Sequence, residues 1–451
     1  MPPTARCGAA LLGAALSASA GLAAAPRGVN TWDSLPNVAS EKDILAFAAY
    51  MNSSLLQFGY DTLTIDGGWW SDASGLVTDA YGRPSPNKAL FPSSADGRGL
   101  RSLVEKVNSM GIKLGAWTIR GIPRAAVEAN LPIWGSSFHL QDAAVLSRNC
   151  SWDAQILGTN APSAAASAWY DSIAQLYLDY GLSFIKADCM FPGSPGGQRF
   201  DEDVLAFATA FSTRAPLIPI SWSPGDGMLP SNGSWIASHN GSFGVMYRIT
   251  PDFHDNSFER LKAHLTIAES YAPLIGQGGT YPDLDMLPLG NQSHGNGPPA
   301  PCLFSHDEQK LIMNLWSIMR APLIIGAMLP LDVDDEWTLS LLTNAAVLAV
   351  NNGTHANAPV AVTVGPTNKT DLHAWTALPD DSGSDAVVAL FNAQDAAADA
   401  VGIALPPPGR DAACWHAADV WTGAQLPGPF SSSFAVPLAA HSSGLFRLSP
   451  C

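Results

Sequence analysis

Asp188 is the residue of this sequence best placed to do chemistry, because it ends a short apolar run. Lys186 stands two residues before it, in the stretch Gly181–Cys189. Residues two apart on a β-strand share a face, so we expect the Lys186 ammonium beside the Asp188 carboxylate. A neighbouring positive charge keeps a carboxylate ionised, which is the state that a nucleophile needs. Lys–Asp pairs at strand ends also occur as structural ion pairs, so the pair alone does not establish catalysis.

Further carboxylates and indoles follow other apolar runs at comparable positions. They are Trp32, Asp66, Trp117, Lys186 with Asp188, Ser221 with Ser223, Arg248 with Asp252, and Asp283 with Asp285. Aromatic rings and carboxylates suit a sugar, which presents C–H groups on one face and hydroxyls on the other. Two facing carboxylates are also what cleavage of a glycosidic bond requires. Core packing is an equal alternative for each tryptophan, and Asp66 could instead cap the following helix.

The pattern of apolar runs predicts the elements that must position these residues. Strand-like and helical patterns alternate over residues 26–350, which fits a (β/α)8 TIM barrel whose active site lies at the carboxyl ends of its strands. A doubly wound sheet is the alternative. The expected strands are Gly28–Trp32, Asp61–Asp66, Ile112–Ile119, Phe184–Asp188, Leu217–Ser221, Val245–Ile249, Pro273–Ile275 and Leu323–Ile325, and the expected helices include Glu41–Leu56, Gly99–Met110, Ala166–Tyr180 and Phe258–Glu269.

The last hundred residues have a different pattern of apolar and turn residues. Short β-patterned runs separated by turn residues recur over residues 351–451 and predict a C-terminal antiparallel β-sandwich. The expected strands are Pro359–Val364, Leu372–Thr376, Ala386–Phe391, Val401–Ala404, Cys414–Trp421 and Ser433–Pro437. The sequence contains no phosphate-binding loop, zinc-ligand spacing or basic tract, so we expect neither a metal nor a cofactor.

Composition narrows the classes of partner. The chain has 451 residues, 47% of them hydrophobic and 14% charged, which describes a well-packed globular protein long enough for two domains. Its net charge of −16 argues against nucleic acid or an anionic membrane surface as a partner. We expect a neutral ligand, with a homodimer as a candidate assembly.

The N-terminus resembles a secretory signal. Arg6 precedes an apolar stretch, and Ala23-Ala24-Ala25 offers a cleavage site before Pro26, so residues 1–25 are predicted to be a signal peptide. No later window is apolar enough to suggest membrane insertion. Glycosylation sequons occur at Asn52, Asn149, Asn232, Asn240, Asn291, Asn352 and Asn368. These features predict a glycoprotein that enters the secretory pathway. Its destination would be the extracellular space, the cell wall, or a vacuole- or lysosome-like compartment.

Five cysteines remain once the predicted signal peptide is removed. Cys150 and Cys189 could bridge the ends of the third and fourth strands, and Cys414 and Cys451 could staple the C-terminal tail. Cys302 would then be a free, buried thiol. The pairing of these last three cysteines stays open at the level of sequence.

Several long motifs, in order, give the chain a resemblance to a known family. They are Gly28-Val-Asn-Thr-Trp32, Ile65-Asp66, Lys113-Leu-Gly115, Phe184–Cys189, Arg248-x-x-x-Asp252, Gly278–Met286 and Leu315–Leu323. With these motifs the sequence resembles the family 27 glycoside hydrolases of clan D, the α-galactosidases and α-N-acetylgalactosaminidases. Ser223-Pro-Gly, Met246–Thr250 and Pro282–Gly290 look most like a plant-type subgroup associated with α-galactosidase and β-L-arabinopyranosidase activity.

The resemblance implies roles for individual residues. Asp188 would be the nucleophile and Asp252 the general acid/base of a retaining exo-glycosidase. Positions that contact the sugar in the family are occupied by Trp32, Asp66, Trp117, Lys186, Arg248 and Asp285. Cys150 and Cys189 fall where the family has a disulfide next to the nucleophile. The implied substrate is a galactose-containing oligosaccharide or glycoconjugate.

Two positions depart from the pattern of the family. Gly67 replaces a carboxylate that often follows the second strand, and Ser223 replaces a glutamate that contacts the 2-hydroxyl. We therefore predict an α-galactosidase with a marked β-L-arabinopyranosidase side activity. An α-N-acetylgalactosaminidase is an alternative on the same scaffold, since a serine at position 223 is also found in enzymes that accept acetamido sugars. A non-catalytic carbohydrate-binding protein is the lower alternative.

Overall fold

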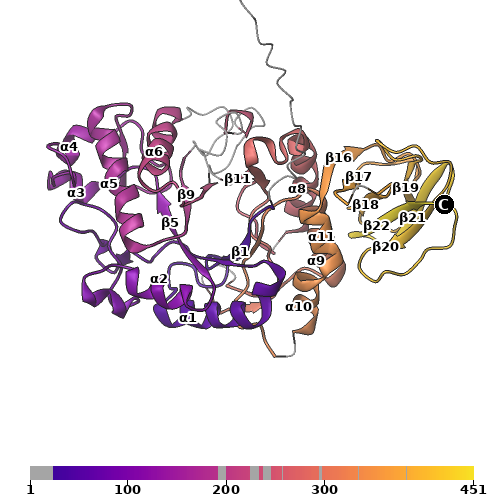
Figure 1. Ribbon diagram of the computed structural model, residues 1–451, viewed down its shortest axis with the longest axis horizontal. Coiled ribbons are helices and arrows are strands. Elements are labelled where there is room, and N and C mark those ends of the chain that lie inside the picture. Colours follow the sequence, from indigo (N-terminus) through magenta and orange to yellow (C-terminus); the bar gives the residue numbers. More distant parts are fainter. Residues whose placement is uncertain are drawn as a thin grey trace, which may run out of the picture.

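The computed structural model (Figure 1) describes residues 24–190, 200–223, 233–236, 245–255, 257–293, 297–333, 335–381 and 383–451. The predicted signal peptide lies outside the described residues except for its last two positions. The sequons at Asn232 and Asn240 also lie outside them.

Eight parallel strands form the sheet at the centre of the larger part of the molecule. In sheet order they are β12 (Tyr281–Asp283), β11 (Met246–Arg248), β10 (Ile220–Ser223), β9 (Phe184–Asp188), β5 (Lys113–Ile119), β2 (Thr62–Ile65), β1 (Arg27–Asn30) and β15 (Leu323–Ile325). The ring closes through Leu287, which follows β12. Its N–H donates to the Ile324 carbonyl at 2.7 Å, and its carbonyl accepts from the Gly326 N–H at 3.1 Å. The predicted TIM barrel is thus confirmed, and a doubly wound sheet is excluded.

Helices follow the strands around the outside of the barrel (Figure 1). They are α1 (Glu41–Tyr50), α2 (Arg101–Asn108), α5 (Ala164–Tyr180), α6 (Asp201–Arg214), α8 (Phe258–Tyr271), α9 (His306–Ile318), α10 (Glu336–Thr343) and α11 (Ala345–Asn352). Side-chain caps fix several of their starts: Ser40 and Ser305 complete capping boxes at α1 and α9, and Ser163 caps α5. After α1 the chain continues as a π-helical turn (Met51–Leu55) and a 3-10 turn (Leu56–Phe58).

Short elements fill the loops between the barrel strands. The loop after β2 holds β3 (Ser71–Asp72), β4 (Gly75–Leu76) and a 3-10 turn (Pro92–Asp96). The long connection between β5 and α5 holds β6 (Ile122–Pro123), α3 (Arg124–Glu128), α4 (Leu140–Ala143), β7 (Ala144–Val145) and β8 (Ile156–Thr159). Further along the chain lie two 3-10 turns (Ala272–Leu274 and Gln277–Gly279), β13 (Asn291–Gln292) and β14 (Ala300–Pro301).

The seventh strand was predicted at the wrong place. Pro273–Ile275 falls largely on a 3-10 turn that continues α8, with Pro273 near the start of the turn, and the strand is β12 at Tyr281–Asp283. Proline is suited to the first turn of a helix because it has no N–H to leave unpaired. The true strand was hard to detect because it is three residues long and contains Pro282.

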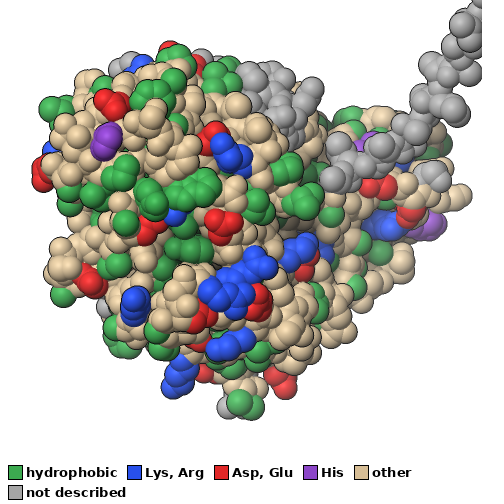
Figure 2. Space-filling view, turned by 60° about the vertical axis from the view of Figure 1, so that its left-hand side comes forward, with side chains coloured by type: hydrophobic (Ala, Val, Ile, Leu, Met, Phe, Trp, Pro, Cys, Tyr) green, Lys and Arg blue, Asp and Glu red, His purple; other side chains and the backbone are tan. Residues whose placement is uncertain are grey.

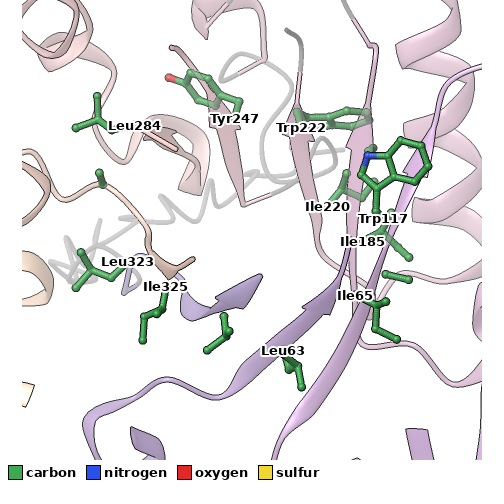
Figure 3. Close-up of a cluster of buried hydrophobic side chains, with 14 of the residues drawn as sticks. Leu63, Ile65, Trp117, Ile185, Ile220, Trp222, Tyr247, Leu284, Leu323 and Ile325 are labelled. Carbon is green, nitrogen blue, oxygen red and sulfur yellow. The ribbon is translucent and has the colours of Figure 1, made fainter. Parts of the chain in front are cut away.

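Alternating side chains give the barrel strands two different faces. Leu63, Ile65, Ile185, Trp222 and Tyr247 are each fully buried, in the cluster of apolar side chains shown in Figure 3. Residues at the intervening positions line a small cavity inside the barrel, among them Thr62, Thr64, Lys186, Ser221, Ser223 and Arg248. Because side chains alternate along each strand, polar side chains point toward the barrel axis and apolar ones lie in the buried cluster.

The C-terminal part consists of antiparallel sheets, drawn from orange to yellow in Figure 1. Five strands pair in the order β16 (Thr354–Val360), β17 (Leu372–Pro379), β18 (Ala386–Asn392), β22 (Ser442–Pro450) and β20 (Trp415–Asp419), and a second sheet pairs β19 (Ala398–Ala404) with β21 (Ser433–Leu438). Both contribute to one apolar core that includes Leu390, Trp415 and Phe434. The predicted β-sandwich is confirmed, while the exact domain limits at residues 25 and 350 stay predictions.

Helix α9 of the barrel hydrogen-bonds to the C-terminal part. The Asn314 side chain donates to the Ser443 hydroxyl at 2.9 Å and accepts from the Trp421 indole N–H at 2.8 Å. Across the described residues, no helix has both the length and the apolar character that crossing a membrane would need.

Candidate active site

A pocket of about 570 Å³ opens at the carboxyl ends of the barrel strands. It brings together seven of the nine residues that were predicted to bind or cleave the sugar: Trp32, Asp66, Trp117, Lys186, Asp188, Arg248 and Asp252. The other two, Ser223 and Asp285, instead line the small cavity in the barrel interior, to which Lys186 and Arg248 also contribute. These two cations thus connect the floor of the pocket with the interior of the barrel.

Asp66 and Lys186 form a buried ion pair at this floor. Asp66 follows β2 directly, and its Oδ2 accepts from Lys186 Nζ at 2.8 Å and from Asn30 Nδ2 at 2.7 Å. Burial alone would lower the pKa of Lys186, but the carboxylates of Asp66 and Asp188 outweigh this effect and raise the pKa. Lys186 therefore remains a fixed positive charge beside Asp188.

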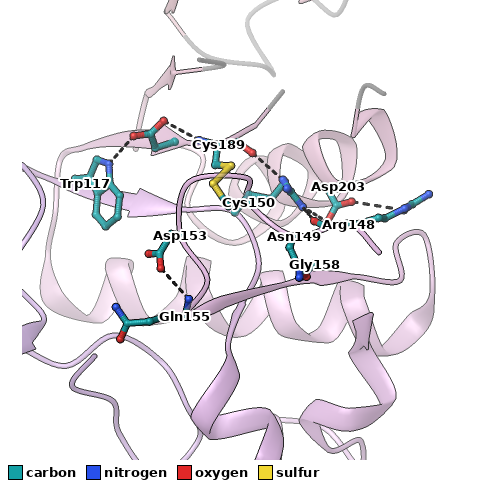
Figure 4. Close-up of a disulfide and its surroundings, with 11 residues drawn as sticks. Trp117, Arg148, Asn149, Cys150, Asp153, Gln155, Gly158, Cys189 and Asp203 are labelled. Carbon is teal, nitrogen blue, oxygen red and sulfur yellow. Dashed lines mark hydrogen bonds and ion pairs between the residues drawn. A yellow bond between two sulfur atoms is a disulfide. The ribbon is translucent and has the colours of Figure 1, made fainter. Parts of the chain in front are cut away.

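Asp188 is the last residue of β9, and both of its carboxylate oxygens are held. The Trp117 indole N–H donates to Oδ2 at 3.0 Å, and the Cys189 N–H donates to Oδ1 at 2.7 Å (Figure 4). Burial raises the pKa of Asp188, and the Lys186 charge and the Trp117 hydrogen bond act against that rise. These contacts orient the carboxylate from two sides, as a reacting group requires.

The Cys150–Cys189 disulfide lies next to this carboxylate (Figure 4), with its two Cα atoms 5.9 Å apart. Cys189 has a φ of 55°, a left-handed conformation that side chains other than glycine rarely adopt. The Arg120 side chain helps to hold it there, because its Nε donates to the Cys189 carbonyl at 2.7 Å. The backbone N–H of Arg120 donates to the Asp188 carbonyl at 3.0 Å, so the end of β9 is fixed in several ways.

The remaining cysteines follow the predicted division. Cys414 and Cys451 form a disulfide, and Cys302 is free. Cys302 is partly buried and its thiol contacts the Pro288 carbonyl at 3.0 Å. Burial raises the pKa of this thiol to about 12, so it is not activated as a nucleophile.

Arg248 organises the opposite wall of the pocket from the end of β11. Its guanidinium makes a short ion pair with Asp252 and a second one with Asp285 at 3.3 Å. Asp285 also accepts from the Phe253 N–H at 2.8 Å, which attaches the segment after β11 to the end of β12. The side chain of Asp252 is 59% exposed, whereas that of Asp285 is only 5% exposed.

The charges around the two carboxylates do not by themselves divide the roles of acid and nucleophile. The Arg248 charge lowers the pKa of Asp252, while burial raises the pKa of Asp188. A general acid would need the higher of the two pKa values. The assignment of Asp188 as nucleophile and Asp252 as acid/base therefore depends on position and stays a prediction.

Sequence reasoning missed several residues that line the same pocket. Asn37, Trp70, Trp152, Asp153 and Gln155 belong to it, and all of them lie on loops or short loop elements. Asn30, whose side chain donates to Asp66, was also missed, although it stands two residues before Trp32 in the same motif. Trp152 could have been found, since it lies two residues after Cys150, whose predicted disulfide to Cys189 brings this loop next to Asp188. Among the described residues, no group of three or more His, Cys, Asp or Glu side chains is arranged to hold a metal ion.

Comparisons with known proteins agree with this geometry. Residues 369–448 match the alpha galactosidase C-terminal beta sandwich domain. The chain is 25% identical to alpha-galactosidase 3 of Arabidopsis thaliana, over 95% of this chain and 83% of that protein. It superposes with a TM-score of 0.86 on a family 27 β-L-arabinopyranosidase from Geobacillus stearothermophilus, at 31% identity over 95% of this chain and 97% of that one. A candidate α-N-acetylgalactosaminidase from Bacillus halodurans gives a TM-score of 0.82 at 30% identity, over 95% and 97% of the two chains. With this fold, this pocket and these relatives, the chain belongs to glycoside hydrolase family 27 and is a glycosidase.

Proposed function

We propose that this glycosidase releases terminal α-D-galactose and, on the same site, terminal β-L-arabinopyranose, with retention of configuration. The observation that carries the proposal is that Asp188 and Asp252 line one pocket together with four tryptophans and the Asp66–Lys186 pair. The chemistry of this set suits a neutral pyranose whose glycosidic bond points toward Asp252.

In the proposed mechanism Asp188 attacks the anomeric carbon while protonated Asp252 donates its proton to the leaving oxygen. Lys186 and the Trp117 N–H stabilise the Asp188 carboxylate before attack. The glycosyl ester that forms has lost the negative charge of Asp188, and loss of that charge lowers the pKa of Asp252. Asp252 is thereby suited to deprotonate the water that cleaves the ester. Two successive inversions give net retention.

The specificity proposal depends on Gly67. The two sugars present the same ring hydroxyls and differ only in the hydroxymethyl group of galactose. Gly67 lines the pocket next to Asp66 and leaves no carboxylate to bind that group. α-Galactosidases are among the relatives of the chain and a β-L-arabinopyranosidase is among its structural neighbours, which supports activity on both sugars.

An acetamido sugar is the less favoured substrate. Ser223 is 2% exposed and lines the interior cavity of the barrel and not the pocket, so it offers no cradle for an acetyl methyl group. We therefore expect low activity on α-N-acetylgalactosaminides.

We also propose that the protein is secreted. The signal-like residues 1–25, the two disulfides and the exposed sequons at Asn52 and Asn368 support this proposal. Mass mapping of secreted material would test cleavage near Ala25 and glycosylation, and sedimentation would distinguish a monomer from the candidate homodimer.

The activity is tested with p-nitrophenyl α-D-galactopyranoside, β-L-arabinopyranoside and α-N-acetylgalactosaminide, using kcat/KM for each. Proton NMR of the first minutes of hydrolysis identifies the anomer that is released first. We expect α-galactose as the first product, kcat/KM for the arabinopyranoside within about a hundredfold of the galactoside, and little activity on the acetamido sugar. Release of the β-anomer of galactose first, or no turnover of either favoured substrate, would contradict the proposal.

A further inference from the structure

Trp152 is an exposed tryptophan at the wall of the catalytic pocket. Its side chain is 56% exposed, and it is the one aromatic residue among the exposed large hydrophobic side chains of the described chain. Of the other tryptophans in the pocket, Trp70 and Trp117 are buried, at 2% and 9% exposure, and Trp32 is half-buried. A large apolar surface left open beside a binding site is typical of a contact that is completed by the ligand.

The loop that carries Trp152 is anchored at both ends. Cys150 is tied to Cys189, the residue after Asp188, by the disulfide. The Asn149 side chain accepts from the Gly158 N–H at 3.1 Å, and Arg124 Nε donates to the Ala154 carbonyl at 2.9 Å. The backbone that carries the indole is therefore held at a fixed place relative to Asp188, and a preorganised loop loses little conformational entropy on binding.

Polar groups flank this indole on the same loop. Ser151, Asp153 and Gln155 line the pocket together with it. Asp153 accepts from the Gln155 backbone N–H at 2.9 Å, and Figure 4 shows both residues on the Trp117 side of the disulfide. The Gln155 side-chain amide has no hydrogen-bond partner within the described residues. An aromatic ring with polar side chains beside it on the same loop suits a second sugar ring.

We propose that Trp152 is the platform for the leaving-group sugar, so that the enzyme favours substrates in which the terminal residue is linked to another pyranose. The inference deepens the proposed function and rests on it. The sugar that is cleaved lies against Asp188, Trp117 and the Asp66–Lys186 pair. The sugar beyond the scissile oxygen must then pass the outer wall of the pocket, where the 151–155 loop stands. Trp152 is in this account a specificity-determining residue that takes no part in the chemistry.

The test compares three leaving groups with the same galactosyl unit in wild type and Trp152→Ala. α-Galactosyl fluoride has a leaving group too small to reach the loop, whereas the disaccharide α-galactosyl-(1→6)-glucose places a pyranose over it. We expect kcat/KM for the disaccharide to fall about five- to thirtyfold in Trp152→Ala, with kcat/KM for the fluoride unchanged. The p-nitrophenyl galactoside should show an intermediate loss, because a nitrophenyl ring also stacks.

Two further variants serve as controls. Trp152→Phe keeps an aromatic face and should recover most of the activity on the disaccharide. Leu146→Ala removes a 71% exposed side chain of the same connection that does not line the pocket, and it should leave all three substrates unaffected.

Transfer of the galactosyl unit to an added sugar, which is the reverse of leaving-group departure, provides a second measurement. With galactosyl fluoride as donor and glucose as acceptor, Trp152→Ala should form less disaccharide relative to hydrolysis, because acceptor and leaving group share one subsite. Equal losses on the fluoride and the disaccharide, or no loss on either, would overturn the role of Trp152 while leaving the proposed glycosidase activity intact. A wild-type protein that cleaves neither substrate would overturn the proposed function itself.

Discussion

Gly67→Asp places a carboxylate where family members often carry one, and the structure shows what it would meet. A Cβ at position 67 would lie 3.0 Å from the Asn37 Oδ1 and 3.2 Å from Cζ3 of Trp32. Both contacts are tighter than usual, but Asn37 Oδ1 ends a flexible side chain and can move aside. The Trp32 ring has less freedom. We therefore expect a variant that folds, with some loss of activity on every substrate.

The selectivity between two substrates is separable from this steric cost. Overpacking at a site such as this one costs about 1–3 kcal/mol, and that cost applies equally to the galactoside and the arabinopyranoside. A hydrogen bond from the galactose hydroxymethyl group to a carboxylate is worth about 1.5–3 kcal/mol and is available to only one of them. The ratio of kcat/KM, galactoside over arabinopyranoside, should therefore rise about ten- to a hundredfold in Gly67→Asp.

The assay uses two p-nitrophenyl glycosides with the same leaving group, so that only the glycone differs. Gly67→Asn is the matched control, because it fills the same space without a charge and should raise the ratio less. Adding Asn37→Ala to Gly67→Asp should restore overall activity by relieving the contact, with the new ratio kept. Equal ratios in Gly67→Asp, Gly67→Asn and wild type would refute this interpretation of Gly67.

Three further perturbations follow from the described contacts. Trp117→Phe removes the donor to Asp188 and should lower kcat/KM about ten- to a hundredfold, with the acidic limb of the pH profile moved to higher pH, since an unsupported carboxylate has a higher pKa. Asp283 is 5% exposed, and burial raises its pKa from 3.8 to about 7, so its contribution to folding is present below pH 3.8 and is lost as the pH rises through about 7. Asp283→Asn lacks this titration, so its free energy of unfolding in urea, relative to that of wild type, should rise by up to about 4 kcal/mol between pH 4 and pH 8. A difference that does not depend on pH would refute this. Replacing both Cys150 and Cys189 with serine opens a link that spans 39 residues and should lower the free energy of unfolding by about 4 kcal/mol in calorimetry, whereas an unchanged stability would contradict it.

Most barrel strands could be predicted because each is a buried apolar run with a clear end. The run Phe184–Asp188 coincides with β9, and Leu323–Ile325 coincides with β15. The seventh strand failed because Tyr281–Asp283 is short and contains proline, while Pro273–Ile275 has strand-like composition at the end of a helix. Local pattern could not distinguish these two segments, since the barrel itself decides which one pairs with β11.

The candidate site could be predicted where it is built from strand ends and not where it is built from loops. Trp117, Lys186 and Asp188 are placed by the register of β5 and β9, which follows from alternation along each strand. Trp152 was missed because it lies on a loop whose place beside the pocket depends on long-range contacts, among them the Cys150–Cys189 disulfide and the hydrogen bond from Arg124 to the Ala154 carbonyl. Ser223 was assigned to the sugar by resemblance, and its side chain lines the interior cavity although the register of β10 and β9 places it opposite Asp188.

The assignment of Asp188 as nucleophile is tested most directly by chemical rescue. Asp188→Ala should lose nearly all turnover of p-nitrophenyl α-galactoside, and added azide should restore release of nitrophenol. Azide would enter the space left by the carboxylate and attack from the same face, so the product should be β-galactosyl azide. Rescue of Asp252→Ala should instead give the α-azide, since azide then opens the glycosyl ester on Asp188. Formation of α-galactosyl azide by Asp188→Ala, or substantial turnover by this variant without azide, would contradict the account.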